Sequence, residues 1–267
     1  MKQIIKKSCV LALTFAFVCG IFLAFTASPV QAAKTKSVYV VKTNKSTDNY
    51  GGSSSYKYTY NSKGFLKKCK TSLSTYKYTY CGEKIVKVTD VPKKGYDSLS
   101  KEVTERTYNN KGLLKKEVIE SKEETTTLTY KYNSKNQRTS YTIKVKRDGK
   151  TSKSTVKISY NAKGQMKKIS SGGYSISYEY DKYGMSTKET TKWKNEDGTA
   201  GEMVNECENQ YKKGRLIKRI ERRKSGDADF LDYENITTYT YKKIKVPKKY
   251  AKKVKEQQKE IIANNAL

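Results

Sequence analysis

The residue types that most often carry enzymatic chemistry are sparse in this chain. None of its 267 residues is a histidine, which excludes Ser-His and Cys-His nucleophilic sites and His-ligated metal centres within the chain. Paired carboxylates could still cleave glycosides, but that reaction needs a cleft that positions both groups, and the sequence indicates none. We therefore predict that the protein is not an enzyme and has no catalytic residues, no cofactor and no metal site.

The carboxylates that cluster most closely are Asp227, Asp229, Asp232 and Glu234. Hard cations use spaced carboxylates of this kind. The segment nevertheless lacks the central glycine and the closing glutamate of an EF-hand loop. We interpret it as an exposed loop between two repeats.

Positive charge is the chemistry that the chain does offer. It has 56 Lys and Arg against 26 Asp and Glu, a formal net charge of +30. Such a charge attracts anionic polymers and surfaces and opposes self-association. A simpler interpretation is that lysine gives each strand a solvated face and blocks edge aggregation. Lysine pairs recur in register, and these are the candidate polyanion-binding residues: Lys67, Lys68, Lys115, Lys116, Lys167 and Lys168.

The lysine pairs belong to a repeat in which a tyrosine-ended strand leads into a polar turn and then into a short apolar and lysine-rich strand. Eight tyrosines end such strands at separations of 20 to 31 residues, a period typical of a stacked array of small units. They are Tyr60, Tyr80, Tyr108, Tyr132, Tyr160, Tyr180, Tyr211 and Tyr241. The repeat also includes Tyr58, Tyr178 and the turn glycines Gly64, Gly112, Gly164, Gly184 and Gly214.

Each unit is predicted to be a β-hairpin. Residues alternate in Tyr56-Lys57-Tyr58-Thr59-Tyr60, so the tyrosines share one face of a strand and Lys57 and Thr59 share the other. In the Asn-x-Lys-Gly turns the asparagine bonds its own backbone and the glycine takes a positive φ. The tyrosines are interpreted as the core of a thin sheet; stacking of tyrosine on sugars or bases is the alternative.

The predicted fold is therefore all-β, an antiparallel meander of repeated hairpins in an open sheet, with a short C-terminal helix. Residues 33–55 should form an N-terminal strand, at Ser37–Lys42, and a polar linker. Residues 56–246 should form the hairpin array. Residues 247–267 follow a proline and have helix-forming composition, so a basic helix at 248–263 should cap the end of the sheet.

The first 32 residues have the pattern of a secretory signal peptide. Three lysines precede an apolar stretch, and Val30 and Ala32 are the small residues before a cleavage site. Cleavage after Ala32 would leave 53 basic and 26 acidic residues, a net charge of +27. An uncleaved membrane anchor is the alternative. If the signal peptide is cleaved, the protein contacts the membrane only transiently, through that peptide.

Three cysteines, Cys69, Cys81 and Cys207, would remain after cleavage. An odd number leaves at least one thiol free or in an intermolecular bond. A hairpin turning at Leu73-Ser74 would place Cys69 opposite Tyr78 and Cys81 opposite Leu66, which argues against a disulfide between them without deciding it.

The recurring pattern Tyr-x-Tyr-Asn/Asp-x-x-Gly-x-Leu resembles the YD repeat of the Rhs family. The copy nearest that signature is Tyr178-Glu179-Tyr180-Asp181-Lys182-Tyr183-Gly184, and the similarity covers roughly residues 56–245. The resemblance implies a long antiparallel sheet of successive hairpins, which in large family members spirals into a shell around a toxin. This chain is too short for such a shell and shows no toxin domain, so encapsulation is not implied.

These observations together predict a secreted, non-enzymatic, cationic bacterial β-repeat protein. Its partners would be anionic polymers or glycans of the cell envelope or the extracellular space. The alternative is a protein-interaction module, related to Rhs and YD-repeat proteins, that docks an unidentified protein through a sheet face or edge. Nucleic acid is a disfavoured partner because of the signal peptide and the lack of a recognition motif.

Overall fold

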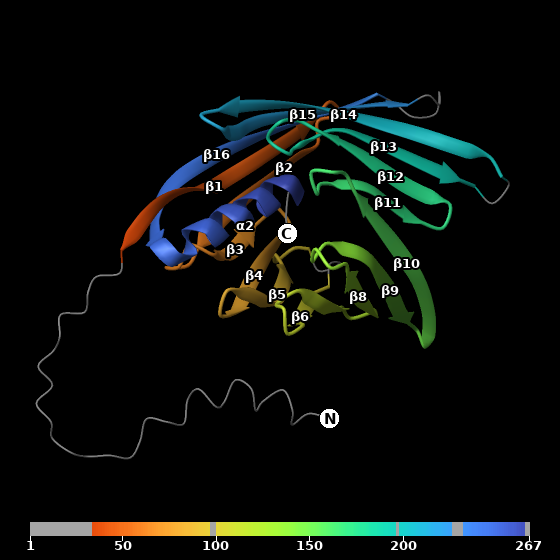
Figure 1. Cartoon of the computed structure of the whole chain (residues 1–267), viewed down its shortest axis with the longest axis horizontal. Helices are drawn as coiled ribbons and strands as arrows, with labels where there is room; N and C mark the ends of the chain where they lie inside the picture. The colour runs from red at the N-terminus through yellow and green to blue at the C-terminus, as the bar shows by residue number, and fades with distance from the viewer. Residues whose placement is uncertain (1–33, 97–99, 196–197, 226–231, 265–267) are drawn as a thin grey trace, which may run out of the picture. The chain divides into compact units, whose positions relative to one another are not determined.

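The computed structural model describes residues 34–96, 100–195, 198–225 and 232–264, and the described residues from Thr35 onward form one compact unit. These residues form sixteen strands, followed by a 3-10 turn and a helix (Figure 1). The first eight strands are β1 (Thr35–Asp48), β2 (Ser53–Tyr60), β3 (Leu66–Lys70), β4 (Ser74–Cys81), β5 (Lys84–Pro92), β6 (Glu102–Tyr108), β7 (Leu114–Glu120) and β8 (Glu124–Tyr132). The others are β9 (Arg138–Arg147), β10 (Lys150–Tyr160), β11 (Met166–Ser171), β12 (Tyr174–Tyr180), β13 (Ser186–Lys194), β14 (Ala200–Lys212), β15 (Arg215–Ser225) and β16 (Tyr233–Pro247). The turn η1 is Lys248–Tyr250, and the helix α2 is Ala251–Asn264.

The strands form a closed antiparallel barrel, so the prediction of an open sheet is wrong. Each strand pairs with its neighbours in sequence, and β1 closes the ring by pairing with β16 along nearly its whole length. The prediction missed that β1 pairs with β16 and so completes the last repeat unit. The eighth tyrosine-ended strand, β16, receives its second strand from the N-terminal end of the array. The expected linker at 43–55 is also wrong, because β1 continues to Asp48 and β2 begins at Ser53.

A β-bulge recurs in every unit at the same place. In the first hairpin Tyr60 pairs with Leu66 and Thr59 pairs with Lys68, which leaves Lys67 as the extra residue. The same shift occurs in all seven hairpins that end in a repeat tyrosine, and once more where Tyr241 pairs with Val41. A bulge bends its strand and increases the local twist. Eight bulges along one rim therefore curve the sheet until its ends meet.

The repeat tyrosines form a ring of hydrogen bonds at that rim, which we call the tyrosine ring. Tyr80 donates its hydroxyl to the carbonyl of Leu66 at 2.7 Å. The acceptor is the residue that pairs with the tyrosine of the preceding unit, and the same bond recurs at 2.7 Å in seven of the eight units. Each tyrosine thus ties its hairpin to the previous one. The exception is Tyr211, which donates to Asp181 Oδ2 at 2.6 Å.

The turn chemistry predicted from sequence is confirmed. Asn61 Oδ1 accepts hydrogen bonds from the backbone of Lys63 and Phe65, both at 3.0 Å, and Gly64 has a φ of 87°. Asp181 makes the equivalent bonds in its own turn. These local bonds supply the hairpin geometry without help from the rest of the barrel.

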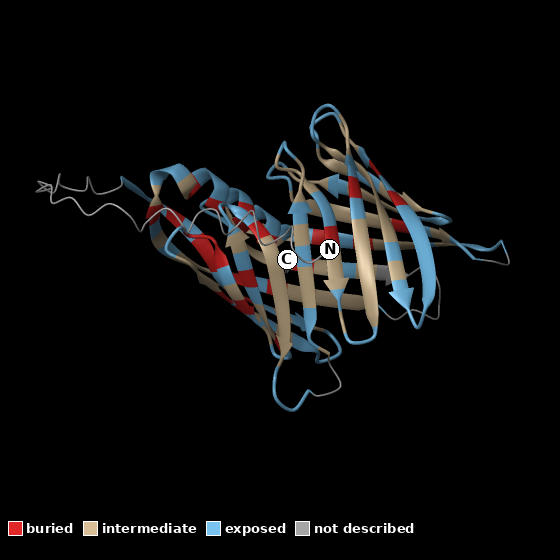
Figure 2. Cartoon of the chain, turned by 90° about the horizontal axis from the view of Figure 1, so that it is seen from below, coloured by how far each residue is buried: buried red, intermediate tan, exposed pale blue. Residues whose placement is uncertain are grey.

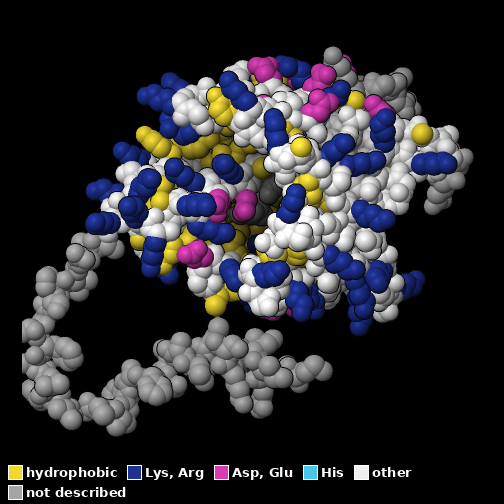
Figure 3. Space-filling model, viewed as in Figure 1, with side chains coloured by type: hydrophobic (Ala, Val, Ile, Leu, Met, Phe, Trp, Pro, Cys, Tyr) yellow, Lys and Arg dark blue, Asp and Glu magenta, His cyan; other side chains and the backbone are white. Residues whose placement is uncertain are grey.

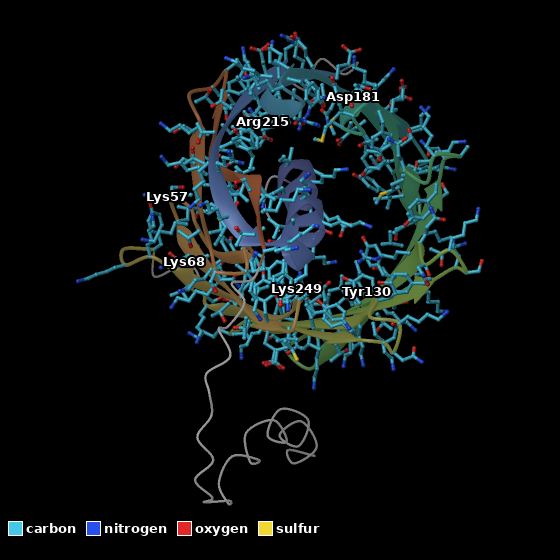
Figure 4. All side chains as sticks on the ribbon, turned by 60° about the vertical axis from the view of Figure 1, so that its left-hand side comes forward. Lys57, Lys68, Tyr130, Asp181, Arg215 and Lys249 are labelled. Atoms are coloured by element: carbon cyan, nitrogen blue, oxygen red, sulfur yellow. The ribbon has the colours of Figure 1, made fainter. Side chains whose placement is uncertain are left out.

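The C-terminal helix lies across the barrel mouth at the tyrosine-ring rim (Figure 4). Val254 and Ile261 are fully buried against residues of β1, β3 and β16. Gln258 Oε1 accepts from the backbone N–H of Val41, and Gln257 Oε1 from that of Leu66, both at 2.8 Å. The helix therefore satisfies backbone donors at the bulges. The expected helix is present, but a closed barrel has no sheet end for it to cap.

The apolar core is concentrated on one side of the barrel. Figure 2 shows most of the buried residues around α2 and the strands next to it, with a few more on strands farther from the helix. Tyr58, Leu66, Cys69 and Tyr78 pack there with the helix. The helix α2 is not long and apolar enough to cross a membrane, and no helix in the described part of the chain is.

The three cysteines are free in the structure, and the register differs from the predicted one. Cys69 pairs with Tyr58 and Tyr76 rather than Tyr78, and Cys81 pairs with Lys84 across the next turn. Cys69 and Cys207 are buried whereas Cys81 is exposed. The signal-peptide prediction lies outside the described residues.

Candidate functional site on the outer wall

The two faces of the barrel wall differ in chemistry. The repeat tyrosines, Leu66 and Cys69 face the interior, and burial raises the pKa of Tyr80 and of the Cys69 thiol to about 12. The alternate positions face outward and are mainly Lys, Thr, Ser and Glu. Figure 3 shows Lys and Arg spread over the viewed face of the molecule. Period-two alternation thus places the charge outside.

Four lysines on β2, β3 and β4 form two directly facing cross-strand pairs, and we call them the outer lysine patch. Lys57 pairs with Lys70, and Lys68 pairs with Lys77. Lys57 and Lys68 lie on the outer side of the ribbon (Figure 4). Lys57, Lys70 and Lys77 are exposed and Lys68 is half-buried. No ion pair joins any of the four to a carboxylate among the described residues.

Like charges placed directly opposite each other on one face of a sheet are destabilising. The outer lysine patch has two such pairs on three consecutive strands. An anion lying across these strands would be near all four ammonium groups, and would remove their mutual repulsion on binding. Another facing pair, Lys144 and Lys153, lies on β9 and β10.

The opposite arrangement occurs on the outer face of β13 to β16. Lys192 Nζ lies 2.7 Å from Glu202 Oε2, and Arg222 Nε lies 2.7 Å from Glu234 Oε2. Lys188 is flanked in register by Glu179 and Glu206. This sector, which we call the ion-paired wall, shows that the same repeat can present basic residues with acidic partners.

The six predicted lysines are not brought together. Lys67, Lys115 and Lys167 are the extra residues of their bulges, and Lys68, Lys116 and Lys168 follow them on β3, β7 and β11. These strands are four positions apart in a ring of sixteen, so β3 and β11 lie on opposite sides of the barrel. The pairs therefore cannot form one stripe. Only Lys68 belongs to the outer lysine patch, with Lys67 beside it.

Sequence reasoning missed Lys57, Lys70 and Lys77. The signal was present in part, because the alternating Tyr-Lys-Tyr segments place Lys57 and Lys77 on the face opposite the tyrosines. What was missing was the register, which decides which lysine stands opposite which.

Two arginines inside the barrel have acidic partners. Arg106 Nε lies 2.7 Å from Glu117 Oε1, and Glu117 also accepts from the hydroxyl of Tyr130. Arg219 lies 2.9 Å from the sulfur of Cys207 and 3.6 Å from Glu189. Burial raises the pKa of the Cys207 thiol to about 11 although Arg219 opposes the shift, so the thiol is protonated at neutral pH and a poor nucleophile. The described residues contain no cluster that could hold a metal ion.

Comparison with known proteins gives no family. No family model and no curated protein matches the chain. A porin-like protein from Bacteroides uniformis ATCC 8492 is similar in structure, with 12% sequence identity and a TM-score of 0.37, over 76% of this chain and 96% of that chain. At this identity and TM-score the likeness carries no functional argument.

Two toxin structures are also similar to part of the barrel. TcdB2-TccC3 without its hypervariable C-terminal region has 13% identity and a TM-score of 0.31, over 71% of this chain and 10% of that chain. The Photorhabdus luminescens Tc holotoxin pore has 14% identity and a TM-score of 0.28, over 68% and 11%. The chain thus spans only about a tenth of each toxin chain.

Proposed function

We propose that the chain is a non-enzymatic cationic barrel that binds anionic polymers at the bacterial cell envelope through its outer lysine patch. The supporting observation is that Lys57 stands directly opposite Lys70, and Lys68 directly opposite Lys77. None of the four has a carboxylate partner among the described residues. If the wall needed only a solvated outer face, it would be more stable with Asp or Glu opposite the lysines, as on β13 to β16.

The chemistry of the outer wall suggests the kind of polymer. Lysine meets phosphate, sulfate or carboxylate as a point charge rather than through a bidentate fork. Binding should therefore depend on anion density more than on the identity of the anion. A wall of lysine and threonine also suits contact with water and polyanions rather than with lipid chains, which require an apolar outer band.

The closed fold weakens the alternative of a protein-interaction module that docks by strand addition. Such docking needs an exposed sheet edge, and the ring from β1 to β16 has no unpaired strand. A protein-interaction module built on this barrel would therefore have to dock through its outer face.

The test is titration of the full chain with an anionic polymer, such as teichoic acid or a sulfated glycan, at several salt concentrations. The variant carries Lys57→Gln, Lys68→Gln, Lys70→Gln and Lys77→Gln. Each lysine near a polyanionic surface contributes about 1 kcal/mol, so affinity at low salt should fall by a factor of about 100 or more. The slope of log K against log salt should decrease by up to about four.

The matched control removes four charges from the ion-paired wall and its neighbours, through Lys188→Gln, Lys192→Gln, Lys194→Gln and Lys218→Gln. Its affinity should change by less than about threefold, because all four lysines lie outside the outer lysine patch, Lys192 is already paired with Glu202, and Lys188 stands between two glutamates. Equal losses in the two variants would show that net charge alone matters and would contradict the proposal. If the unmodified chain does not bind polyanions even at low salt, the positive charge serves solubility alone and the proposal is wrong.

A further inference from the structure

A hollow of about 420 Å³ lies between α2 and the rim formed by the turns of β12 to β15, and we call it the mouth pocket. Its volume falls in the range of small-ligand sites. The pocket lies inside the rim, apart from the outer lysine patch.

Four tyrosines line the mouth pocket. The rings of Tyr183 and Tyr211 have centroids 4.2 Å apart, and Tyr39 and Tyr241 stand on either side of Arg215, whose Cζ lies 4.1 Å and 5.9 Å from their centroids. Tyr183 is 50% exposed and Tyr39 47%. Large aromatic side chains left exposed around a concavity are typical of a ligand site.

Every charged residue that lines the mouth pocket is basic. Arg215 comes from β15, and Lys255 and Lys259 come from one face of α2, four residues apart. The hollow on the other side of α2 differs, because Glu83, Glu256 and Glu260 line it together with basic residues. An anionic ligand is therefore favoured in the mouth pocket over the neighbouring hollow.

Gln258 supplies an unused donor at the same place. Its Oε1 accepts a hydrogen bond from the backbone N–H of Val41 at 2.8 Å, and the Tyr60 hydroxyl, which donates to the Val41 carbonyl, lies 3.2 Å away. Its Nε2 has no partner among the described residues although the residue is only 6% exposed. A buried amide donor of this kind is normally satisfied, and an oxygen of a bound ligand would satisfy it.

The tyrosine-ring hydrogen bond is replaced at this pocket and in no other described unit. Tyr211 is the tyrosine that leaves the tyrosine ring, and the carbonyl of Ser186 that would accept its hydroxyl is taken by Asn209 and Arg219, at 3.0 and 3.3 Å. Asp181 holds Tyr211 instead, beside Tyr183. The lost bond from Tyr211 to Ser186 and the paired rings of Tyr183 and Tyr211 thus lie on the same wall of the pocket.

We infer that the mouth pocket binds a six-membered sugar ring that carries a carboxylate or a phosphate. The tyrosine faces would stack on the ring, Arg215 and the two lysines would hold the anion, and Gln258 Nε2 would donate to a ring substituent. Exposed tyrosine ring faces beside a cation distinguish such a ligand from a free anion, which needs no stacking surface. The inference is independent of the outer lysine patch.

Isothermal titration of the full chain with methyl glucuronide, glucose 1-phosphate, methyl glucoside and inorganic phosphate tests this inference. At least one of the two acidic sugars should bind with a Kd below about 1 mM, and the neutral sugar and free phosphate should bind at least about tenfold more weakly. Which acidic sugar binds better identifies the anion. Equal binding of phosphate would reveal a plain anion site and would overturn the inference, as would equal binding of methyl glucoside.

Tyr183→Ala and Arg215→Gln should each weaken acidic-sugar binding by about tenfold or more, because each removes one half of the recognition. Tyr174→Ala is the matched control, since Tyr174 is 44% exposed and does not line the pocket; it should bind as the unmodified chain does. The variant of the outer lysine patch should also bind the acidic sugar normally. Unchanged binding in Tyr183→Ala and Arg215→Gln, or loss of binding in the outer-patch variant, would place the site elsewhere.

Discussion

Two sectors of one barrel wall, built from the same repeat, have opposite arrangements. Behind the outer lysine patch the interior is dense, since Tyr58, Leu66, Cys69 and Tyr78 pack with α2. In the ion-paired wall the outer face has acidic partners for its basic residues. The interior of this wall is polar at Arg219, Asn205 and Thr237, whereas Leu216 and Tyr239, nearer the tyrosine ring, belong to the same core as Tyr58. The first sector thus combines facing lysines with an apolar interior, and the second combines ion pairs with an interior that is only partly apolar.

The difference shows how a barrel can hold an unfavourable surface. Facing lysines lower stability by a few tenths of a kcal/mol to about 1 kcal/mol per pair, and burial of large side chains offsets this many times over. A functional surface that destabilises the fold is therefore best placed over the densest part of the core. Each of the following predictions tests one side of this contrast.

The largest effect is expected from equivalent turn glycines in the two sectors. Gly64 and Gly184 have φ values of 87° and 83°, so valine is strained at both. At Gly64 a Cβ atom would also overlap Val246 and lie 3.0 Å from Val254, whereas at Gly184 the nearest atom is 3.5 Å away. Gly64→Val should lower the unfolding free energy by about 3 kcal/mol or more, and Gly184→Val by about 1 to 2 kcal/mol.

Urea unfolding followed by circular dichroism would measure both variants. Equal losses would show that the interior behind β2 to β4 accommodates a larger residue, which would remove the contrast in packing between the sectors.

The tyrosine ring should contribute differently in the two sectors. The hydroxyl of Tyr80 donates to Leu66 and accepts from Gln257 Nε2 at 3.0 Å, so Tyr80→Phe leaves two groups unsatisfied and should destabilise the fold by about 1 to 2 kcal/mol at any pH from 3 to 7. Tyr211 instead donates to the Asp181 carboxylate, so the effect of Tyr211→Phe should depend on pH.

The direction of that dependence follows from Asp181. Burial tends to raise the pKa of this carboxyl, but hydrogen bonds from Tyr211, from the backbone of Met185 and Tyr183 and from Asn209 outweigh it, and the pKa is lowered from its usual value of 3.8. The stabilisation is present above about pH 4 and is lost as the pH falls through the lowered pKa. The difference between Tyr211→Phe and the unmodified chain should therefore be constant above about pH 4 and shrink as the pH falls further. A constant difference would contradict the charge-assisted bond.

The smallest effects on stability should come from reciprocal charge changes. Lys70→Glu places a carboxylate opposite Lys57, and should raise the unfolding free energy by roughly 0.2 to 1 kcal/mol while weakening polyanion binding. Glu202→Lys places a second cation opposite Lys192 and should lower the unfolding free energy by a similar amount. Thermal melting and polymer titration on both variants would show whether stability and binding change in opposite directions. Unchanged polymer binding in Lys70→Glu would mean that the patch does not contribute to binding, and a loss of stability would mean that the facing lysines do not repel each other.

The sequence indicates the local structure of this protein well. The tyrosine alternation, the asparagine or aspartate at the start of each turn and the following glycine predict the hairpins, because these signals act within a few residues. The turn of Asn61 to Gly64 and the outward direction of Lys57 are both consequences of local sequence. The helix after Pro247 is indicated in the same way.

Only the tertiary structure decided closure and the sites. Pairing of β1 with β16 joins residues about 200 positions apart, and no local signal specifies that the N-terminal strand completes the eighth unit. The facing of Lys57 with Lys70 depends on a register that the bulge at Lys67 sets. The mouth pocket needs the barrel to be closed and α2 to lie across it. Sequence thus determined what each hairpin is and which residues face outward, because those properties follow from backbone preferences and period-two alternation. Closure, register and the pocket arose only when distant strands met, because they depend on long-range pairing energies that no short segment contains.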